Sequence, residues 1–305
     1  MTVKLRSVYF RHVHLDDALR RADIEAQMQL IVRNVRIKHP DMGIRTIYHK
    51  MAPIGIGRDA FEDICRANGL MRDPFKNFHK TTDSSHTRFY PNFIENVVPD
   101  APNQVWQSDI TYFEINKHFY YITLIQDAFT KIIVAAIASD NLTTLSTTLP
   151  AFKIAFKSLD QQLMHILIFH SDGGGQYYAK LLSKLSIPCY LIRSMGKSCY
   201  ENAMAESING VVKNKYLYHR SINSFTDLKR ELDRTVLLYN EDKPHSALQR
   251  MTPNAFKKKW ISCNRQTDAR MTESISAKVQ MNGASCPIPL SQTNARNPDV
   301  ICAIK

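Results

Sequence analysis

The chain has few of the features that mark disulfide-rich, metal-finger or membrane proteins. Its six cysteines are scattered through 305 residues without a C-x-x-C pair, so neither a disulfide scaffold nor a paired-cysteine zinc site is indicated. No run approaches the ~20 apolar residues of a membrane span. The charged N-terminus lacks the apolar stretch of a signal peptide. These absences predict a cytoplasmic protein with no membrane partner.

Two catalytic motifs are also missing. There is no G-x-x-x-x-G-K-[ST] and no H-E-x-x-H, which excludes the phosphate loop of nucleotide hydrolases and that class of zinc peptidase. His170 and Ser171 are adjacent, and on a strand they would point to opposite faces. A serine–histidine nucleophile pair is therefore not expected there.

Positive charge is plentiful but unevenly placed. The net charge is +12. Residues 1–95 carry 16 Lys and Arg against 11 acidic residues, 96–206 carry 8 against 9, and 207–260 carry 11 against 5. Basic segments on both sides of a nearly neutral middle indicate a polyanion partner, most simply nucleic acid. An ordinary soluble protein of high pI is the alternative.

The N-terminal residues 1–70 have a helical pattern. Apolar residues recur at helical spacing over 15–38, and "IRTIYHKM" resumes the helix after Pro40 and Gly43. A glycine-bearing turn and another amphipathic helix follow, with Gly69 as its C-terminal cap. Two short helices around a turn of three or four residues fit a DNA-binding helix-turn-helix. A purely structural helical hairpin is the alternative.

A change of pattern separates a linker, 71–103, from a second domain, 104–258. The runs "VWQSDITYFEI", "HFYYITLIQ" and "KIIVAAIAS" predict an antiparallel meander. "LMHILIF" and "IPCYLI" add two strands, so the expected fold is α/β, a mixed five-stranded sheet with flanking helices. The predicted helices are 143–159 with a kink at Pro150, a short one in "YYAKLLSKL", 202–219, and 224–240 with Ser224 as N-cap. Residues 259–305 read as a weakly ordered tail.

Three acidic residues stand at unusual positions in this pattern. Asp109 interrupts the first strand, Asp172 ends the fourth, and Glu206 belongs to a polar helix stripe of Asn202, Glu206, Asn209 and Lys213. Taken singly, each fits an ordinary surface acid. The first and fourth strands of a mixed sheet are able to pair, however, which would bring the two aspartates together with Glu206 delivered by the helix.

Three converging carboxylates require a cation, because they cannot all stay ionised without compensation. Oxygen ligands select Mg²⁺ or Mn²⁺ over zinc. Two such ions ~3.5–4 Å apart stabilise the attacking and leaving oxygens of a phosphoryl displacement. The glycines of "DGGG", residues 172–175, would let a phosphodiester approach without meeting a Cβ. A simple hairpin turn is the alternative for this stretch.

Four blocks, in order, resemble those of the integrase-core transposases of bacterial insertion sequences. They are "VWQSDITYF", "HSDGGGQYY", "SCYENAMAESINGVVKNKY" and "YNEDKPHSALQRMTPNAF". The chain is similar in particular to the second-reading-frame product of the two-frame elements. Its segment "HPDMGIRTIYHKM…ICRANGL" is similar to the helix-turn-helix of that family, so the resemblance covers roughly residues 5–258.

The resemblance implies an RNase-H-like core and a DDE transposase. Asp109, Asp172 and Glu206 would hold two Mg²⁺ ions, while water and then a freed 3′-hydroxyl attack DNA. The implied partners are terminal inverted repeats, target DNA, further copies of the chain and a first-reading-frame protein, with a nucleoid location. Glu201 stands where the family usually has aspartate, and Ser198-x-x-Glu201 also fits a capping box for the helix of Glu206.

Further residues are candidate DNA contacts, with solvated surface cations as the alternative. His245 either lines the site or packs the closing helix, and packing is favoured. The candidates are Lys213, Lys197, Asn202, Arg193 and His245 in the second domain, and Arg45 and Arg58 in the first.

Three functions remain open from the sequence. A Mg²⁺-dependent transposase is expected first. A catalytically inactive or repurposed DNA-binding protein would bind DNA with steep salt dependence and cut nothing. A related nuclease acting on branched or hybrid nucleic acid is disfavoured by the first and last blocks.

Overall fold

The computed structural model divides into two compact units, Met1–His79 and Lys80–Lys305. It describes residues 2–72, 90–159, 166–179, 189–196 and 199–264, together with Leu182 and Leu185. Within these ranges, no helix combines the length and apolarity needed to cross a bilayer. The helix expected in "YYAKLLSKL" lies partly outside the described residues, and the tail after Asn264 lies wholly outside them.

The first unit consists of three helices, α1 (Thr2–Lys38), α2 (Ile44–Met51) and α3 (Arg58–Ala67). Its core gathers apolar side chains from all three, with Val32, Ile47 and Phe61 fully buried. Gly69 ends α3 with φ of 64°, the left-handed conformation expected of a glycine after a helix. The turn between α2 and α3 spans residues 52–57, longer than the three or four residues expected.

The second unit is built on a five-stranded mixed sheet with the strand order β3-β2-β1-β4-β5. β2 runs antiparallel to both β1 and β3, whereas β4 runs parallel to both β1 and β5. The strands are β1 (Val105–Ile115), β2 (His118–Asp127), β3 (Ile133–Ser139), β4 (Ile166–Ser171) and β5 (Tyr190–Met195). This is the RNase-H-like arrangement, and it confirms the expected pairing of the first and fourth strands.

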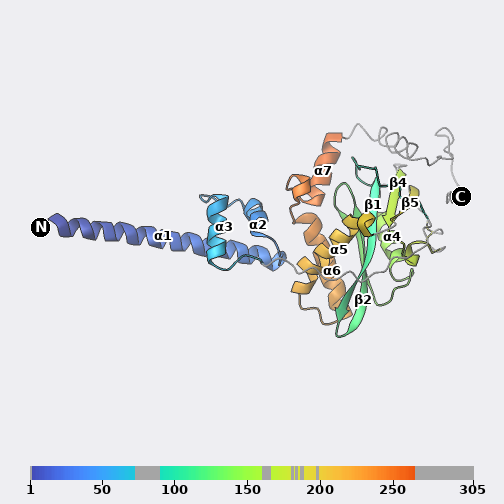
Figure 1. Cartoon of the computed structure of the whole chain (residues 1–305), viewed down its shortest axis with the longest axis horizontal. Helices are drawn as coiled ribbons and strands as arrows, with labels where there is room; N and C mark the ends of the chain where they lie inside the picture. Colours follow the sequence, from blue (N-terminus) through green and yellow to red (C-terminus); the bar gives the residue numbers. More distant parts are fainter. Residues whose placement is uncertain are drawn as a thin grey trace. The chain divides into compact units, whose positions relative to one another are not determined.

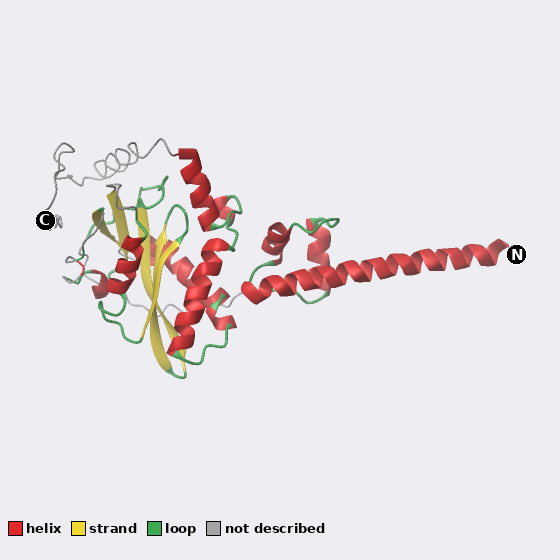
Figure 2. Cartoon of the chain, turned by 180° about the vertical axis from the view of Figure 1, so that it is seen from behind, coloured by secondary structure: helices red, strands yellow, loops and turns green. Residues whose placement is uncertain are grey.

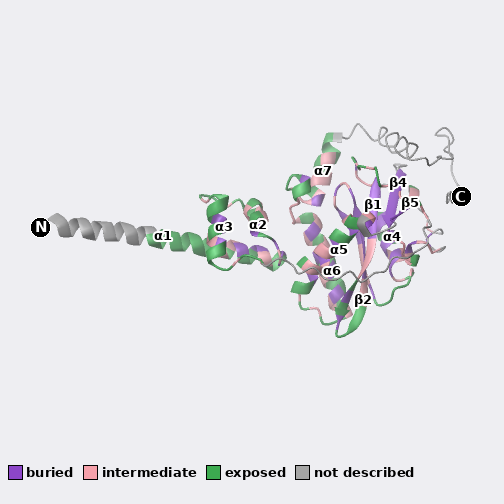
Figure 3. Cartoon of the chain, viewed as in Figure 1, coloured by how far each residue is buried: buried purple, intermediate pink, exposed green. Residues whose placement is uncertain are grey.

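Helices cover both faces of the sheet (Figures 1 and 2). α4 (Thr148–Lys157) packs Phe152 and Phe156 against Trp106 on one face. On the other face, α5 (Ala203–Lys215) and α6 (Phe225–Glu241) contribute Val212 and Leu232 to a second core. β4 is buried along its whole length (Figure 3), as expected for a strand covered on both sides.

Several helix boundaries differ from the expected ones. α4 begins at Thr148, so Pro150 lies in its first turn. Backbone N–H groups of the first turn have no partner within the helix, so proline removes no helical hydrogen bond there and the expected kink does not follow. α5 ends at Lys215 and is followed by a 3₁₀ turn, η4 (Leu217–His219). α6 begins as predicted, with the Ser224 side chain accepting from the Asp227 N–H. A last helix, α7 (Pro253–Asn264), extends into the range expected for the tail.

Candidate active site

Asp109 and Asp172 occupy equivalent positions on neighbouring parallel strands. Ser108 of β1 is paired with Ser171 of β4 at the last position of that ladder, and each aspartate is the next residue along. β4 ends there, so Asp172 opens a loop, while β1 continues along β2. The two carboxylates therefore lie at the same edge of the β1–β4 pair.

In the loop after β4, Gly174 leaves room for contacts within the loop itself. The Gly174 N–H donates to Asp172 Oδ1 at 3.1 Å. A Cβ on Gly174 would lie 3.1 Å from that oxygen and 3.0 Å from Gln176 Oε1, whereas a Cβ on Gly175 would meet nothing within 4 Å. Gly174 thus permits the loop that orients Asp172, and space remains open beside Gly175.

The polar stripe predicted on α5 faces β1. Asn202, just before the helix, donates to the Ser108 carbonyl at 3.2 Å. Asn209 donates to Asp109 Oδ2 at 2.8 Å, and Lys213 donates to Thr111 Oγ1 at 3.2 Å. The remaining member of the stripe, Glu206, is exposed. The register of these contacts places α5 alongside β1 at the point where β4 ends.

The charges of Asp172 and Glu206 act on Asp109. Burial raises the pKa of Asp109 to about 7, and the neighbouring charges of Asp172 and, more weakly, Glu206 add to the rise. Hydrogen bonds from the Ile110 N–H and from Asn209 oppose it. The ionised form of Asp109 is therefore disfavoured unless positive charge lies nearby.

The donor set fits a hard divalent cation, since every candidate ligand is a carboxylate oxygen. The raised pKa of Asp109 is the observation that favours positive charge at this place. In the conformation described, no three histidine, cysteine or acidic side chains within the described ranges are already gathered around one metal position. Asp109, Asp172 and Glu206 are the residues whose oxygens could hold such ions.

Two tyrosines of the loop after β4 support the aspartates, and the sequence analysis did not single them out. The Tyr178 hydroxyl donates to the Asp172 carbonyl at 2.6 Å. The buried Tyr177 hydroxyl lies 2.9 Å from Ser108 Oγ. The only sequence signal was their place in "GGGQYY", directly after a candidate ligand.

The other candidate DNA-contacting residues of this unit have different neighbours. Lys213 Nζ lies 4.6 Å from the centre of the Tyr112 ring, beside Asp109. Arg193 donates to the Tyr177 carbonyl at 3.4 Å. Asn202 is buried with its amide on β1, so its contact is with the sheet. Lys197 lies outside the described residues.

The partly buried His245 packs against α6, the arrangement that the sequence analysis favoured over a place in the site. Its ring lies edge-on to that of Tyr239, 4.7 Å between centres. Burial lowers the pKa of His245 to about 3, and the positive charges of Lys243 and Lys131 lower it further. A neutral, packed imidazole is the result.

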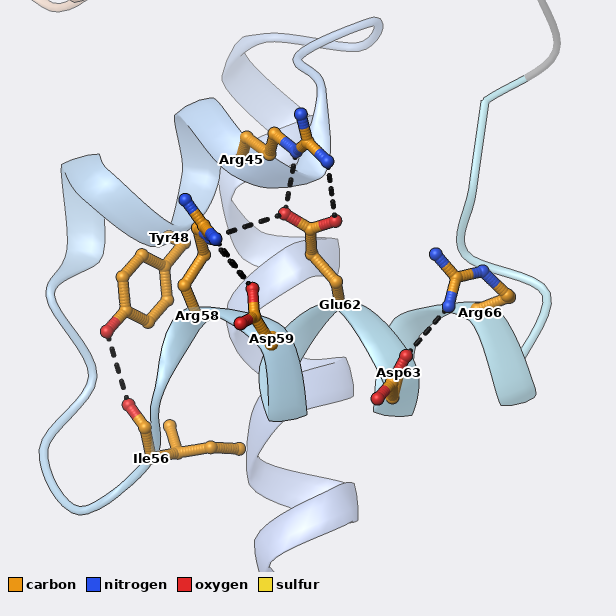
Figure 4. Close-up of polar contacts among 8 residues, drawn as sticks. All are labelled: Arg45, Tyr48, Ile56, Arg58, Asp59, Glu62, Asp63 and Arg66. Carbon is orange, nitrogen blue, oxygen red and sulfur yellow. Dashed lines mark hydrogen bonds and ion pairs between the residues drawn. The ribbon is translucent and has the colours of Figure 1, made fainter.

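Arg45 and Arg58 of the first unit converge on one acid (Figure 4). Arg45 makes two hydrogen bonds to the nearly buried Glu62, at 2.8 and 3.3 Å. Arg58 lies 3.9 Å from Glu62 and pairs with Asp59 at 2.8 Å. The Arg45 side chain is nevertheless 76% exposed, so it remains accessible to a polyanion.

Known proteins resemble the chain in both sequence and structure. Two family models, both described as integrase core domain, match residues 99–198 and 189–253. The chain is 30% identical over 264 residues to an uncharacterized 31 kDa protein of insertion element IS600 from Shigella sonnei, covering 84% of this chain and 95% of that protein.

Other relatives match over shorter stretches. The transposase for insertion sequence element IS629 from Shigella sonnei is 32% identical over 130 residues, 41% of each chain, so the match spans less than half of that relative. Among solved structures, the HTLV-2 integrase catalytic core domain in complex with magnesium is 20% identical with a TM-score of 0.41, covering 52% of this chain and 98% of that one.

Proposed function

Because the chain belongs to the integrase-core transposases of bacterial insertion sequences, we propose that it cleaves and joins DNA at the ends of such an element by Mg²⁺-dependent phosphoryl transfer. The observation that carries this proposal is the placement of Asp109 and Asp172 one residue beyond the paired Ser108 and Ser171, with the pKa of Asp109 raised by burial and by the charges of Asp172 and Glu206. An aspartate whose ionised form is opposed by two neighbouring acids, beside an open loop, favours a divalent cation and a phosphodiester over an ordinary solvated surface.

The proposed roles follow from the contacts of each side chain. Asn209 and the Ile110 N–H orient the two oxygens of Asp109, and the Gly174 N–H orients Asp172. When bound, two Mg²⁺ or Mn²⁺ ions supply positive charge for the attacking and leaving oxygens. Lys213, two turns along α5 from Glu206, is placed to contact a neighbouring phosphate.

The proposed partners follow from the reaction. Transposition requires two ends of the element, so we expect the chain to act on terminal inverted repeats and target DNA as a homo-oligomer. A first-reading-frame protein of the same element is the proposed source of specific end recognition. The first unit, with its exposed Arg45, is the proposed additional DNA contact. All these partners place the protein at the nucleoid.

The test is cleavage of a labelled terminal inverted repeat, taken from the DNA that flanks the gene, with Mg²⁺ present. The wild-type chain is expected to cut at the end of the repeat. Asp109→Asn is expected to lose activity by about 10³-fold or more, while its binding to the same DNA is unchanged. If wild type binds the repeat but cuts nothing with Mg²⁺ or Mn²⁺, the chain is a DNA-binding protein without this activity.

A further inference from the structure

A short segment in the loop region that precedes β1, Tyr90–Ile94, contacts three parts of the candidate site. We call it the strap. The Pro91 carbonyl accepts from the Met195 N–H at the end of β5. Phe93 is buried in a cluster that includes Val105 of β1 and Met204 of α5. The strap therefore runs along the outer edge of the sheet and reaches the start of α5.

We propose that Asn92 is a positioning residue for the acidic site: through Glu201 it holds the start of α5, and with it Glu206, against the sheet. This inference rests on the proposed function for its catalytic consequence. The carrying contact joins Asn92 Nδ2 to Glu201 Oε2 at 2.7 Å, between residues 109 positions apart in the chain. Glu201 lies in the 3₁₀ turn η3 (Cys199–Asn202), five residues before Glu206.

α5 continues directly from η3, so a contact that holds η3 also holds the start of the helix. α5 begins at Ala203, and its N-cap residue, Asn202, makes no side-chain hydrogen bond to the helix N–H groups. The Glu201 carboxylate accepts a hydrogen bond from Asn92, and Glu201 stands in the 3₁₀ turn that precedes α5; the predicted capping box of Ser198 and Glu201 stays a prediction. Ser198, the other member of the predicted capping box, lies outside the described residues.

Asn92 is itself held in place. Its Oδ1 accepts from the Ile94 N–H at 3.0 Å, so the amide orientation that donates to Glu201 is determined locally. The next residue, Phe93, donates its N–H to Ser194 Oγ at 2.9 Å. Ser194 Oγ in turn lies 2.9 Å from Nδ1 of the buried His170, two residues before Asp172. The strap is thus anchored to β4 and β5 on both sides of the Asn92 contact.

The other end of the strap reaches the Asp172 loop. The Tyr90 ring stacks on that of Tyr178, with 5.4 Å between centres and 28° between planes. The Tyr178 hydroxyl donates to the Asp172 carbonyl. One segment therefore contacts both the loop that presents Asp172 and the turn that leads to Glu206, which is the geometry needed to keep two ligands in a constant relative position.

The size of the expected effect follows from the precision that phosphoryl transfer requires. A misplacement of ~1 Å at a catalytic group costs ~100-fold in rate. Loss of a half-buried hydrogen bond that served only stability would instead lower the melting temperature and leave turnover by the folded protein unchanged. Turnover of the folded enzyme and stability therefore separate the two roles.

The experiment compares full-length wild type with Asn92→Ala, Asn92→Gln, Glu201→Gln and Glu201→Asp, using the labelled inverted repeat and a Mg²⁺ titration. Asn92→Ala is expected to lower turnover about 10- to 100-fold and to raise the half-saturating Mg²⁺ concentration, with DNA affinity within about twofold of wild type. Glu201→Gln keeps an acceptor of the same length and is expected to remain near wild type.

A paired exchange and a matched control sharpen the test. Asn92→Gln combined with Glu201→Asp moves one methylene from one partner to the other, and is expected to recover activity that each single change loses. Asn254 makes an equivalent bond of 2.6 Å to Glu241, between α7 and α6. Asn254→Ala removes that bond and is expected to leave turnover and Mg²⁺ dependence unchanged.

Hydrogen exchange gives a readout that needs no activity. Amides of residues 199–209 are expected to exchange about tenfold faster in Asn92→Ala than in wild type. In Asn254→Ala their exchange rates are expected to equal those of wild type. If wild type cuts no DNA, the proposed function fails while exchange still decides whether the strap holds α5. Unchanged exchange in Asn92→Ala overturns the inference. If wild type is active, the inference is also overturned when Asn92→Ala leaves turnover unchanged. It is overturned as well when Asn254→Ala loses as much turnover as Asn92→Ala.

Discussion

The Asn209 side chain donates a 2.8 Å hydrogen bond to Asp109 across 100 residues of chain. This bond joins the middle of α5 to β1 at the point where β4 ends. It lies beside Ile208 and Val212, the apolar residues of α5 that pack in the core on the same face of the sheet. The raised pKa of Asp109 and the hydrogen bonds that orient its carboxylate lead to the following predictions.

Replacing Asp109 should stabilise the metal-free protein at high pH. The pKa of Asp109 is about 7 in the folded state, against ~3.9 when unfolded. The folded state therefore binds this proton more tightly, and the stabilisation, complete below pH ~4, is lost as the pH rises towards 7. Asp109→Asn removes the buried charge, and is expected to raise the free energy of unfolding by about 1–3 kcal/mol at pH 8.

Denaturant unfolding in the presence of a chelator measures this difference. Addition of Mg²⁺ should then raise the stability of wild type and leave Asp109→Asn unchanged. A variant that is less stable than wild type at pH 8, or that gains equally from Mg²⁺, contradicts the electrostatic account of the site.

Lys213 should contribute a single phosphate contact. Lys213→Gln is expected to weaken binding of the inverted repeat and to reduce the slope of log affinity against log salt by about 1. Binding measured between 50 and 200 mM salt tests this, with the exposed Lys157 of α4 as the site of a matched charge change. Equal effects of Lys213→Gln and Lys157→Gln would show that only net charge matters.

Two histidines, the buried His170 and the partly buried His245, should make the second unit sensitive to acid. Burial lowers the pKa of His170 to about 4 and that of His245 to about 3, from ~6.5 in the unfolded chain. The unfolded state therefore takes up protons first, and stability present above pH ~6.5 is lost as the pH falls towards 4. The expected loss between pH 7 and 5 is about 2 kcal/mol for each histidine.

This loss is best measured in Asp109→Asn, which removes the titration of opposite sign. The free energy of unfolding of that variant should fall between pH 7 and 5, and His245→Asn introduced beside it should remove about half of the slope. A slope that is flat before the histidine change would contradict neutral burial of these rings.

Arg45 should be a DNA contact that Glu62 restrains. Glu62→Gln keeps a hydrogen-bond acceptor for Arg45 but removes the negative charge next to two arginines. The affinity for non-specific duplex is therefore expected to rise several-fold with a steeper salt dependence, and Arg45→Gln is expected to lower it. Affinity that is insensitive to both changes would exclude this surface of the first unit from DNA binding.

The sequence predicted the parts of this site that depend on local pattern. A run of β-branched and aromatic residues located β1, helical spacing put Asn209 and Lys213 on one stripe, and Ser224 marked the start of α6. Each of these features is determined by neighbours a few residues away.

The contacts that the sequence did not predict join residues that are distant in the chain. Nothing near Asn92 indicates that its amide meets Glu201, and a capping pattern in the neighbouring sequence suggested a different role for that acid. The roles of Tyr177 and Tyr178 arise from the fold of their loop against Ser108 and Asp172. Such contacts are set by tertiary packing, which overrides local propensity.

Crystals soaked in Mn²⁺ and measured by anomalous diffraction would address the carboxylate assembly most directly. The account predicts anomalous peaks with Asp109 and Asp172 oxygens in the coordination shell and Glu206 drawn in to complete it. A well-ordered site without any peak, or with a peak that Glu206 does not reach, would contradict it.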